Sequence, residues 1–294
     1  MKFMRLVCAV TLLCAACLDL DAFLYNPKPV DHYTFSYGPS VPATWRVPKA
    51  QREELTLPDE NGGDVYAVML WQPGAARSTA STILYHHGNK YGIDEYWVRV
   101  SHLWALGANV LVYEYPGYGR ASGEPSEAGI YRNARAASAY LHSLGAQINQ
   151  RRIFHYGYSL GGGPALEIAS SEGTYRGLIT ESIFASVDAL VADGSLVVPA
   201  SFVTHNRFDN QAKMAAAARN SQLGALLMHG SADDFVDPKY LEQLGQAVGS
   251  AAPHHEVLAQ GADHTSVPGW SKYDATVRAF LEQSAEKPDP VVGR

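Results

Sequence analysis

Cysteine is scarce in this chain of 294 residues. Its three cysteines all lie within the first seventeen positions, so the rest of the chain cannot hold a disulfide framework or a zinc site of the usual spacing. Basic residues are also in the minority, with 23 Lys and Arg against 29 Asp and Glu. No positive cluster is present, which excludes a nucleic-acid footprint and a polybasic membrane patch. Charged residues make up only 18% and hydrophobic residues 47%, which indicates a globular protein with a sizeable core.

The cysteines belong to an N-terminal segment with its own pattern. Lys2 and Arg5 precede the apolar residues 6–13, and small residues follow up to Cys17. This pattern predicts that residues 1–16 are a signal peptide and that the protein is exported, because the apolar run is too short to span a bilayer. The segment resembles a bacterial lipoprotein signal, although Cys14 stands where an aliphatic residue is commoner. That resemblance implies a lipidated Cys17 and a cell-envelope location. The alternatives are a secreted soluble protein and a buried N-terminal helix.

Three further segments follow the signal. Residues 17–49 are rich in Pro, Tyr and Ser without a helical or alternating period, which predicts a tether that wraps over the domain surface. Residues 286–294 contain two prolines and little apolar content, so we expect a flexible tail. Residues 50–285 show no second alternating block and no long linker. They therefore predict one domain.

The domain alternates strand-like and helix-like stretches. This order predicts an α/β fold with a mostly parallel eight-stranded sheet, an antiparallel edge and helices on both faces. The expected strands are Glu54–Leu57, Val65–Trp71, Thr82–His86, Val110–Tyr113, Ile153–Tyr156, Leu178–Glu181, Ala225–Met228 and His255–Leu258. The expected helices are Tyr96–Leu106, Glu127–Leu144, Leu160–Ser170, Met214–Arg219, Pro238–Val248 and Trp270–Gln283.

One strand runs into a nucleophile motif. Residues 157–161 read Gly-Tyr-Ser-Leu-Gly between the expected strand and an apolar helix. Gly157 and Gly161 lack a Cβ, so strand and helix can pass closely while Ser159 is held in a strained conformation with its hydroxyl exposed. The pentapeptide alone is a weak signal, because a turn with a capping serine would look similar. Its position between strand and helix predicts a nucleophilic Ser159.

A serine nucleophile needs a base and an acid that orients the base. Asp233 follows a strand at its carboxyl end, where open α/β sheets place active-site groups, and Asp234 is the alternative. Both could instead cap the next helix. His264 lies in a loop before the last helix and is the expected general base. The remaining histidines considered are expected to be surface or packing residues: His102, His142, His155, His254 and His255.

The loop after the strand Thr82–His86 is expected to stabilise an oxyanion. Backbone N–H groups of Asn89 and Leu160 are the expected donors, Gly88 permits close approach, and His87 braces the loop. A metal site made of His86 and His87 is disfavoured, since adjacent strand residues face opposite ways.

Together these motifs resemble the α/β-hydrolase superfamily. Within it, the chain is similar to the branch of depalmitoylating thioesterases, monoacylglycerol and lysophospholipid lipases, and serine aminopeptidase-like enzymes. The motifs that carry the resemblance are His87-Gly88-Asn89, residues 114–127, Gly157 to Gly161, His229-Gly230-x-x-Asp233 and Gly261-x-x-His264; Glu114 departs from the commoner Asp. The resemblance implies an ester, thioester or amide hydrolase that needs no metal or organic cofactor.

Substrate choice is the least determined property. Residues 182–221 are too few for a large cap, and Leu190–Phe202 is apolar enough to line a pocket. We expect an open site for small-molecule or lipid acyl esters and thioesters, with membrane attachment through a lipidated Cys17. Acyl transfer and amide hydrolysis use the same triad and stay open, as does a non-catalytic envelope binding protein. The oligomeric state is not determined by the sequence.

Overall fold

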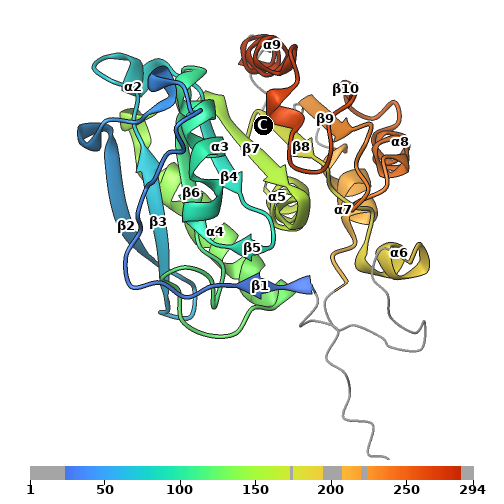
Figure 1. Cartoon of the computed structure of the whole chain (residues 1–294), viewed down its shortest axis with the longest axis horizontal. Helices are drawn as coiled ribbons and strands as arrows, with labels where there is room; N and C mark the ends of the chain where they lie inside the picture. The colour runs from blue at the N-terminus through green and yellow to red at the C-terminus, as the bar shows by residue number, and fades with distance from the viewer. Residues whose placement is uncertain (1–23, 173–174, 195–206, 220–223, 286–294) are drawn as a thin grey trace, which may run out of the picture.

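The computed structural model describes residues 24–172, 175–194, 207–219 and 224–285. A sheet of eight strands lies at its centre, in the order β10-β9-β8-β7-β4-β6-β3-β2 (Figure 1). In that order the strands are β10 His254–Ala259, β9 Gly224–Gly230, β8 Gly177–Glu181, β7 Ile153–Tyr158, β4 Thr82–His86, β6 Asn109–Tyr113, β3 Asp64–Leu70 and β2 Arg52–Pro58. Every expected strand overlaps one of these.

The sheet is parallel over most of its width. Six adjacent strands run parallel: β10, β9, β8, β7, β4 and β6. Strand β3 is antiparallel to β6, and β2 is antiparallel to β3. The predicted α/β class, with an antiparallel edge formed by the first strands, is confirmed. All residues of β4, β6, β7, β8 and β9 are buried, as expected for parallel strands covered on both faces.

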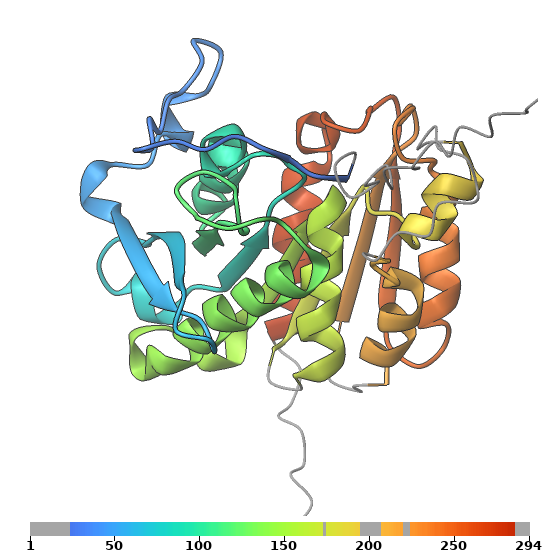
Figure 2. The ribbon, with the colours of Figure 1, turned by 90° about the horizontal axis from the view of Figure 1, so that it is seen from below.

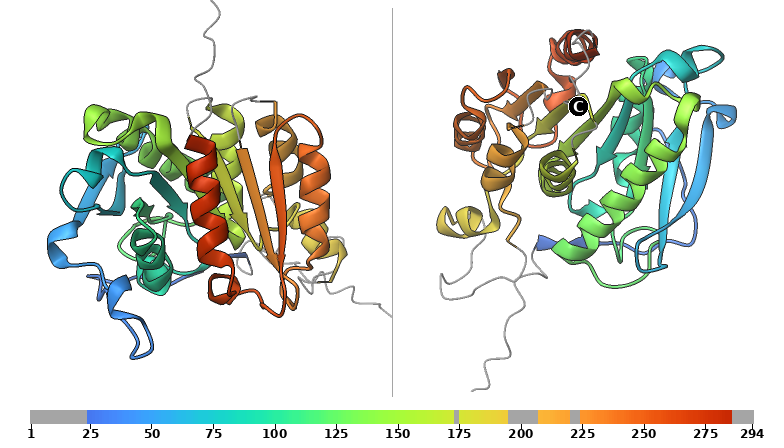
Figure 3. Two further views of the ribbon diagram at one scale, coloured as in Figure 1. Left: turned by 90° about the horizontal axis from the view of Figure 1, so that it is seen from above. Right: turned by 180° about the vertical axis from the view of Figure 1, so that it is seen from behind.

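Helices cover both faces of this sheet. Two hydrophobic clusters show the division: α3 and α9 pack on one face, and α4, α5, α7 and α8 pack on the other. Figure 3 shows α9 in front of the sheet in its left panel and α4 crossing the opposite face in its right panel. The helices are α2 Ala76–Thr79, α3 Ile93–Ala105, α4 Glu127–Ser143, α5 Gly162–Ser171, α6 Val187–Ala192, α7 Asn210–Ala217, α8 Lys239–Val248 and α9 Tyr273–Ala285.

The helix boundaries differ from the expected ones for local reasons. Helix α3 begins at Ile93 rather than Tyr96, because the Glu114 carboxylate accepts a hydrogen bond from the Ile93 N–H at 3.0 Å and caps the first turn. A single 3₁₀ turn, Ser159–Gly161, comes before α5. The short helix α6 was not predicted. It begins with the Ser186 side chain accepting from the Ala189 N–H.

Residues 24–49 run along the surface of the domain, as Figure 2 shows. Strand β1 (Asn26–Pro27) pairs in parallel with β5 (Lys90–Tyr91), and neither strand was predicted. Further along, the Asp94 carboxylate accepts hydrogen bonds from the N–H groups of Thr34 and Phe35. The N-terminal segment is therefore fastened beside the loop that holds Asn89.

Some predictions fall outside this part of the chain. Residues 1–16, Cys17, residues 195–202 of the apolar stretch and the tail 286–294 are not among the described residues. Within the described residues, no helix is long and apolar enough to cross a bilayer.

Candidate active site

Ser159 sits in a sharp turn between β7 and α5. Its φ of +52° lies in the left-handed region that L-residues rarely adopt, and its side chain lies beside the N-terminus of α5. A Cβ on Gly157 would lie 2.6 Å from the Gly161 carbonyl oxygen, and a Cβ on Gly161 would lie 2.0 Å from the His86 carbonyl oxygen. Both contacts are far shorter than real Cβ contacts, so the turn requires glycine at both positions.

Replacing Gly161 by alanine is expected to destabilise the fold by about 3 kcal/mol, because the added Cβ meets the backbone of β4 rather than a movable side chain. The measurement is urea unfolding followed by circular dichroism. Gly269→Ala is the matched control: nothing lies within 4 Å of its Cβ position, so we expect a change below about 0.5 kcal/mol. Equal stabilities of the two variants would contradict the packing described.

The predicted triad residues come together from three strand ends. The Ser159 Oγ lies 3.1 Å from the His264 Nε2, and the His264 Nδ1 lies 2.8 Å from the Asp233 Oδ2. Asp233 is buried and follows β9, whereas His264 follows β10 and is only slightly exposed. Asp234 is exposed, and the carboxylate that contacts His264 is that of Asp233. The structure therefore brings together Ser159, His264 and Asp233, and it leaves the alternative acid outside the site.

Asp233 is held as a charged acceptor. Burial alone would raise the pKa of its carboxyl, but hydrogen bonds from His229 and His264 outweigh burial and hold this pKa well below the ordinary range. The His229 Nε2 lies 3.2 Å from the Asp233 Oδ2. The other carboxylate oxygen accepts the N–H groups of Phe235 and Val236 at 3.0 and 2.9 Å. His229 was not predicted as part of the site, although it belongs to the His-Gly-x-x-Asp motif.

A compact loop presents His264. A Cβ on Gly230 would lie 2.4 Å from the Ala262 carbonyl oxygen, so the end of β9 and the histidine loop touch through their backbones. The Asp263 carboxylate accepts the N–H groups of Thr265 and Ser266 at 2.8 and 2.9 Å. These bonds tighten the turn around His264, which fixes where its imidazole points.

The loop after β4 places the expected oxyanion donors beside Ser159. Asn89 and Leu160 both line the cavity at the Ser159 side chain. The Asn89 carbonyl accepts hydrogen bonds from the Tyr118 hydroxyl and the Asn26 N–H at 2.9 and 3.1 Å. Among the described residues, the Asn89 N–H has no hydrogen-bond acceptor, which leaves it available to an incoming oxygen.

Gly88 and His87 support this loop. A Cβ on Gly88 would lie 2.8 Å from the Tyr96 hydroxyl oxygen, so only glycine lets the loop approach Tyr96 this closely. The His87 Nδ1 lies 2.7 Å from the Gly88 carbonyl oxygen, and the His87 ring stacks on Tyr115 with centroids 3.9 Å apart. The Tyr115 hydroxyl in turn donates to the His87 carbonyl at 2.7 Å.

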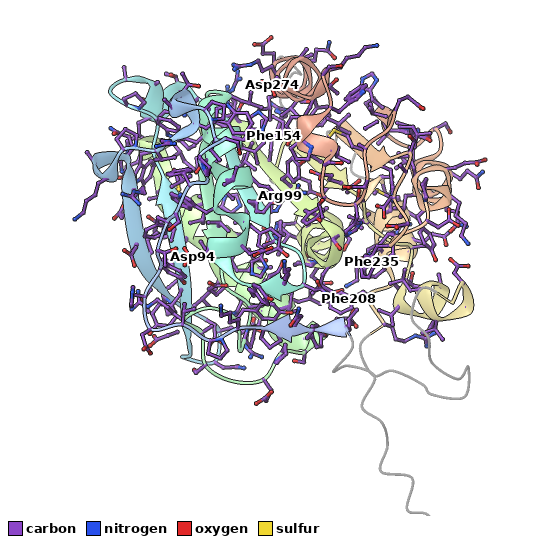
Figure 4. All side chains as sticks on the ribbon, in the orientation of Figure 1. Asp94, Arg99, Phe154, Phe208, Phe235 and Asp274 are labelled. Atoms are coloured by element: carbon purple, nitrogen blue, oxygen red, sulfur yellow. The ribbon has the colours of Figure 1, made fainter. Side chains whose placement is uncertain are left out.

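Sequence reasoning missed a buried cluster centred on Arg99, which Figure 4 labels on α3. The Arg99 guanidinium donates to the Glu181 carboxylate at 2.8 Å and to the Thr265 carbonyl at 2.5 Å. It also lies 3.9 Å from the centre of the Tyr158 ring, and the Tyr158 hydroxyl donates to the His264 carbonyl at 3.2 Å. Arg99 and Tyr158 thus hold two consecutive carbonyls of the histidine loop.

One signal could have found Arg99. It follows Tyr96 by three positions and precedes Leu103 by four, and both neighbours are buried. This spacing places Arg99 on the core face of α3, where an arginine needs a partner. The sequence did not indicate that the partner would be Glu181.

Replacing Arg99 by methionine is expected to lower the free energy of unfolding by about 3–5 kcal/mol, because it leaves the fully buried Glu181 without its cation. Chemical unfolding measures the loss. Adding Glu181→Gln to this variant removes the stranded charge and should restore part of the stability. An Arg99→Met protein as stable as the wild type would show that the pair contributes nothing.

The other histidines pair away from Ser159. The His86 Nε2 lies 3.0 Å from the His155 Nδ1, and the His86 Nδ1 lies 2.7 Å from the Tyr113 hydroxyl. Burial lowers the pKa of His86 well below its ordinary value and that of His155 to about 3, so both stay neutral near pH 7. His102 contacts Asp274 at 2.7 Å. No group of three or more potential ligands that could hold a metal occurs in the described part of the chain.

Sequence comparison finds relatives over much of the chain. Residues 74–172 match the family described as Chlamydia CHLPS protein (DUF818). The chain is 22% identical over 257 residues to the uncharacterized protein YfhR of Salmonella typhi, which covers 83% of this chain and 80% of that protein.

Several solved structures superpose on most of this chain although their sequence identity to it is low. The Pyrococcus furiosus esterase Pf2001 superposes with a TM-score of 0.67 at 15% identity, over 88% of this chain and 97% of the esterase. A puromycin-hydrolyzing peptidase of Mycobacterium tuberculosis superposes with a TM-score of 0.58 at 15% identity, over 87% of this chain and 43% of the peptidase. At these identities the likeness shows a common fold.

Proposed function

We propose that this chain, which has the α/β-hydrolase fold, is a serine hydrolase that cleaves carboxylic ester or thioester bonds. One observation carries the proposal. A serine held at positive φ, a histidine and a buried aspartate form a continuous chain of contacts of 3.1 and 2.8 Å, from the nucleophile oxygen to the carboxylate. This arrangement supplies a nucleophile, its base and the group that orients the base.

The first half of the proposed reaction forms an acyl-enzyme. The His264 Nε2 accepts the Ser159 proton as the Oγ attacks the acyl carbonyl carbon. The carbonyl oxygen becomes an oxyanion that accepts hydrogen bonds from the Asn89 and Leu160 N–H groups. When the intermediate collapses, the bond to the leaving oxygen or sulfur breaks, and His264 gives that atom its proton.

The second half releases the acid. Water loses a proton to His264 while its oxygen attacks the acyl carbon, and the bond to Ser159 then breaks as the proton returns to the Oγ. Asp233 keeps a proton on the His264 Nδ1 and stabilises the imidazolium in both halves. The low pKa of Asp233 supports this role, because the carboxylate must stay charged throughout.

Rapid mixing with para-nitrophenyl acetate tests the proposal. An acyl-enzyme that forms faster than it hydrolyses releases a burst of nitrophenol stoichiometric with enzyme, and mass spectrometry should place the acetyl group on Ser159. The same enzyme is then compared on a thioester and an aminoacyl amide. Faster cleavage of the amide would favour the aminopeptidase-like alternative, and transfer to added alcohols would favour an acyltransferase. A folded protein without turnover or acyl-enzyme would support a non-catalytic envelope binding protein.

We also infer that the protein is exported and anchored through a lipid on Cys17. The support is the charged, apolar and small-residue pattern of residues 1–17. In bacterial cells, Cys17→Ser should abolish incorporation of a labelled fatty acid and move the protein from the membrane fraction to the soluble one. Unchanged labelling would contradict the anchor, and absence of labelling in both proteins would favour a secreted soluble form.

A further inference from the structure

Two cavities meet at Ser159, and they differ in size and chemistry. The larger has a volume of about 200 Å³ and is lined in part by Lys90, Glu95, Tyr96, Arg99 and His264. The smaller has a volume of about 20 Å³ and is lined mainly by apolar side chains. These are Leu24, Leu160, Phe184, Leu190, Phe235 and Val236. Asn89, Ser159 and Phe235 line both cavities, so the reacting carbonyl group must lie where the cavities join.

The proposed reaction decides which part of the substrate each cavity receives. His264 must come within about 2.6–3.2 Å of the leaving atom to give it a proton. His264 lines only the larger cavity, so that cavity receives the leaving group. Leu160, whose N–H is a proposed oxyanion donor, lines only the smaller cavity. With the leaving group in the larger cavity, the acyl group faces the smaller one, beside the oxyanion donors.

The volumes set the size of each part. About 10–15 Å³ holds one water molecule, so 20 Å³ accommodates a group of about the size of an acetyl methyl. A cavity of about 150 Å³ holds a benzene ring, so 200 Å³ accommodates a ring-sized group. The acyl chain of a lipid ester exceeds the volume of the smaller cavity.

The polarity of the linings sets the chemistry of each part. Among the described residues, the smaller cavity is lined by apolar side chains apart from Asn89 and Ser159, so a hydroxylated or charged acyl group would find few replacements for its hydration there. In the larger cavity, the Lys90 ammonium and the Glu95 carboxylate form an ion pair of 2.7 Å and remain partly exposed. Together with the Tyr96 hydroxyl, they offer donors and acceptors to hydroxyl groups of a ligand.

We propose that the substrate is a short-chain acyl ester, an acetyl ester, of a ring-sized alcohol that carries several hydroxyl groups. This inference rests on the proposed serine-hydrolase function, because the assignment of the two cavities uses the role of His264. Phe235 separates the two cavities and packs edge-on against His264 with ring centroids 5.0 Å apart; Figure 4 labels it after β9. Phe184 lines the smaller cavity and not the larger one.

The acyl half is tested with para-nitrophenyl acetate, butanoate, octanoate and palmitate, which share one leaving group. We expect kcat/KM to fall about tenfold or more between acetate and octanoate. Phe184→Ala enlarges the acyl cavity and should raise the octanoate-to-acetate ratio of kcat/KM about tenfold. Phe280→Ala is the matched control, because Phe280 is equally buried but packs against Phe154 on the other face of the sheet. It should leave the ratio unchanged.

The leaving-group half is tested with the acetate esters of methyl glucoside and cyclohexanol. We expect kcat/KM to favour the sugar ester by about tenfold or more, and Lys90→Met to reduce this preference. Lys28→Met is the control: the Lys28 and Lys90 ammonium groups lie 5.3 and 5.0 Å from the same Tyr91 ring, but Lys28 does not line the larger cavity. It should keep the preference.

The results separate this inference from the function on which it rests. Fastest turnover on octanoate or palmitate by the wild-type protein would overturn the short-acyl assignment while leaving a serine hydrolase in place. Preference for cyclohexyl acetate would overturn the polar leaving group. No Ser159-dependent cleavage of any ester would overturn the proposed function itself. Turnover of the four nitrophenyl esters by the wild-type protein decides the length of the acyl group even if Phe184→Ala fails to fold.

Discussion

Ser159→Ala is expected to lower kcat for ester hydrolysis by about 10⁴- to 10⁶-fold, the range seen when a serine protease loses its nucleophile. The remaining activity would come from substrate binding and the oxyanion donors. The side chain lost is small and sits in a turn fixed by Gly157 and Gly161, so the fold should be retained. Steady-state kinetics on para-nitrophenyl acetate measure the loss, and circular dichroism checks the fold.

Ser182 provides the matched control for this experiment. It is also a buried serine at positive φ, with φ of +51°, at the end of the neighbouring strand β8. Its hydroxyl has no hydrogen-bond partner among the described residues, whereas the His264 Nε2 contacts the Ser159 Oγ, so Ser182→Ala should change kcat by no more than about threefold. His264→Ala should match Ser159→Ala, because the triad acts as a unit. An Ser159→Ala protein with activity within about tenfold of the wild type would mean that another group attacks the substrate.

Asp233→Asn is expected to lower kcat by about 10⁴-fold with little change in the fold. The carboxylate accepts a hydrogen bond from the His264 Nδ1 at 2.8 Å, and an asparagine amide can donate there instead. His264 would then carry its proton on Nε2, facing the Ser159 Oγ, and could not accept the serine proton. The asparagine oxygen can still accept the N–H groups of Phe235 and Val236.

The neighbouring residue distinguishes the catalytic role from a general effect of charge. Asp234→Asn makes the same chemical change one position along the chain, at an exposed side chain. We expect its kcat to stay within about twofold of the wild type. If Asp234→Asn lost activity and Asp233→Asn kept it, the acid assigned to the triad would be wrong.

The sequence predicted the sheet, the six longer helices and the grouping of Ser159, Asp233 and His264 because each depends on local patterns. Buried parallel strands give continuous apolar runs, and their carboxyl ends meet at one edge of the sheet. The motif around Ser159 is complete within five residues, and the two glycines that shape it could be recognised for that reason. The acid and the histidine each follow a strand of their own.

The missed features depend on contacts between distant residues. Arg99 and Glu181 are 82 positions apart, so no local pattern indicates the pair. The pairing of β1 with β5 involves two-residue strands, which are too short for an alternating pattern. The lining of the smaller cavity includes Leu24, Phe184 and Phe235 from three separate segments, so its size could not be predicted from the sequence.

Labelling with a fluorophosphonate probe tests the central claim most directly, because the probe reacts only with an activated serine and requires no knowledge of the substrate. We predict one phosphonyl group per molecule of folded wild-type protein, mapped to Ser159 by peptide mass spectrometry. Ser159→Ala should show no label, whereas Ser182→Ala should label like the wild type. Absence of label in folded wild-type protein, or label at a serine other than Ser159, would contradict the account.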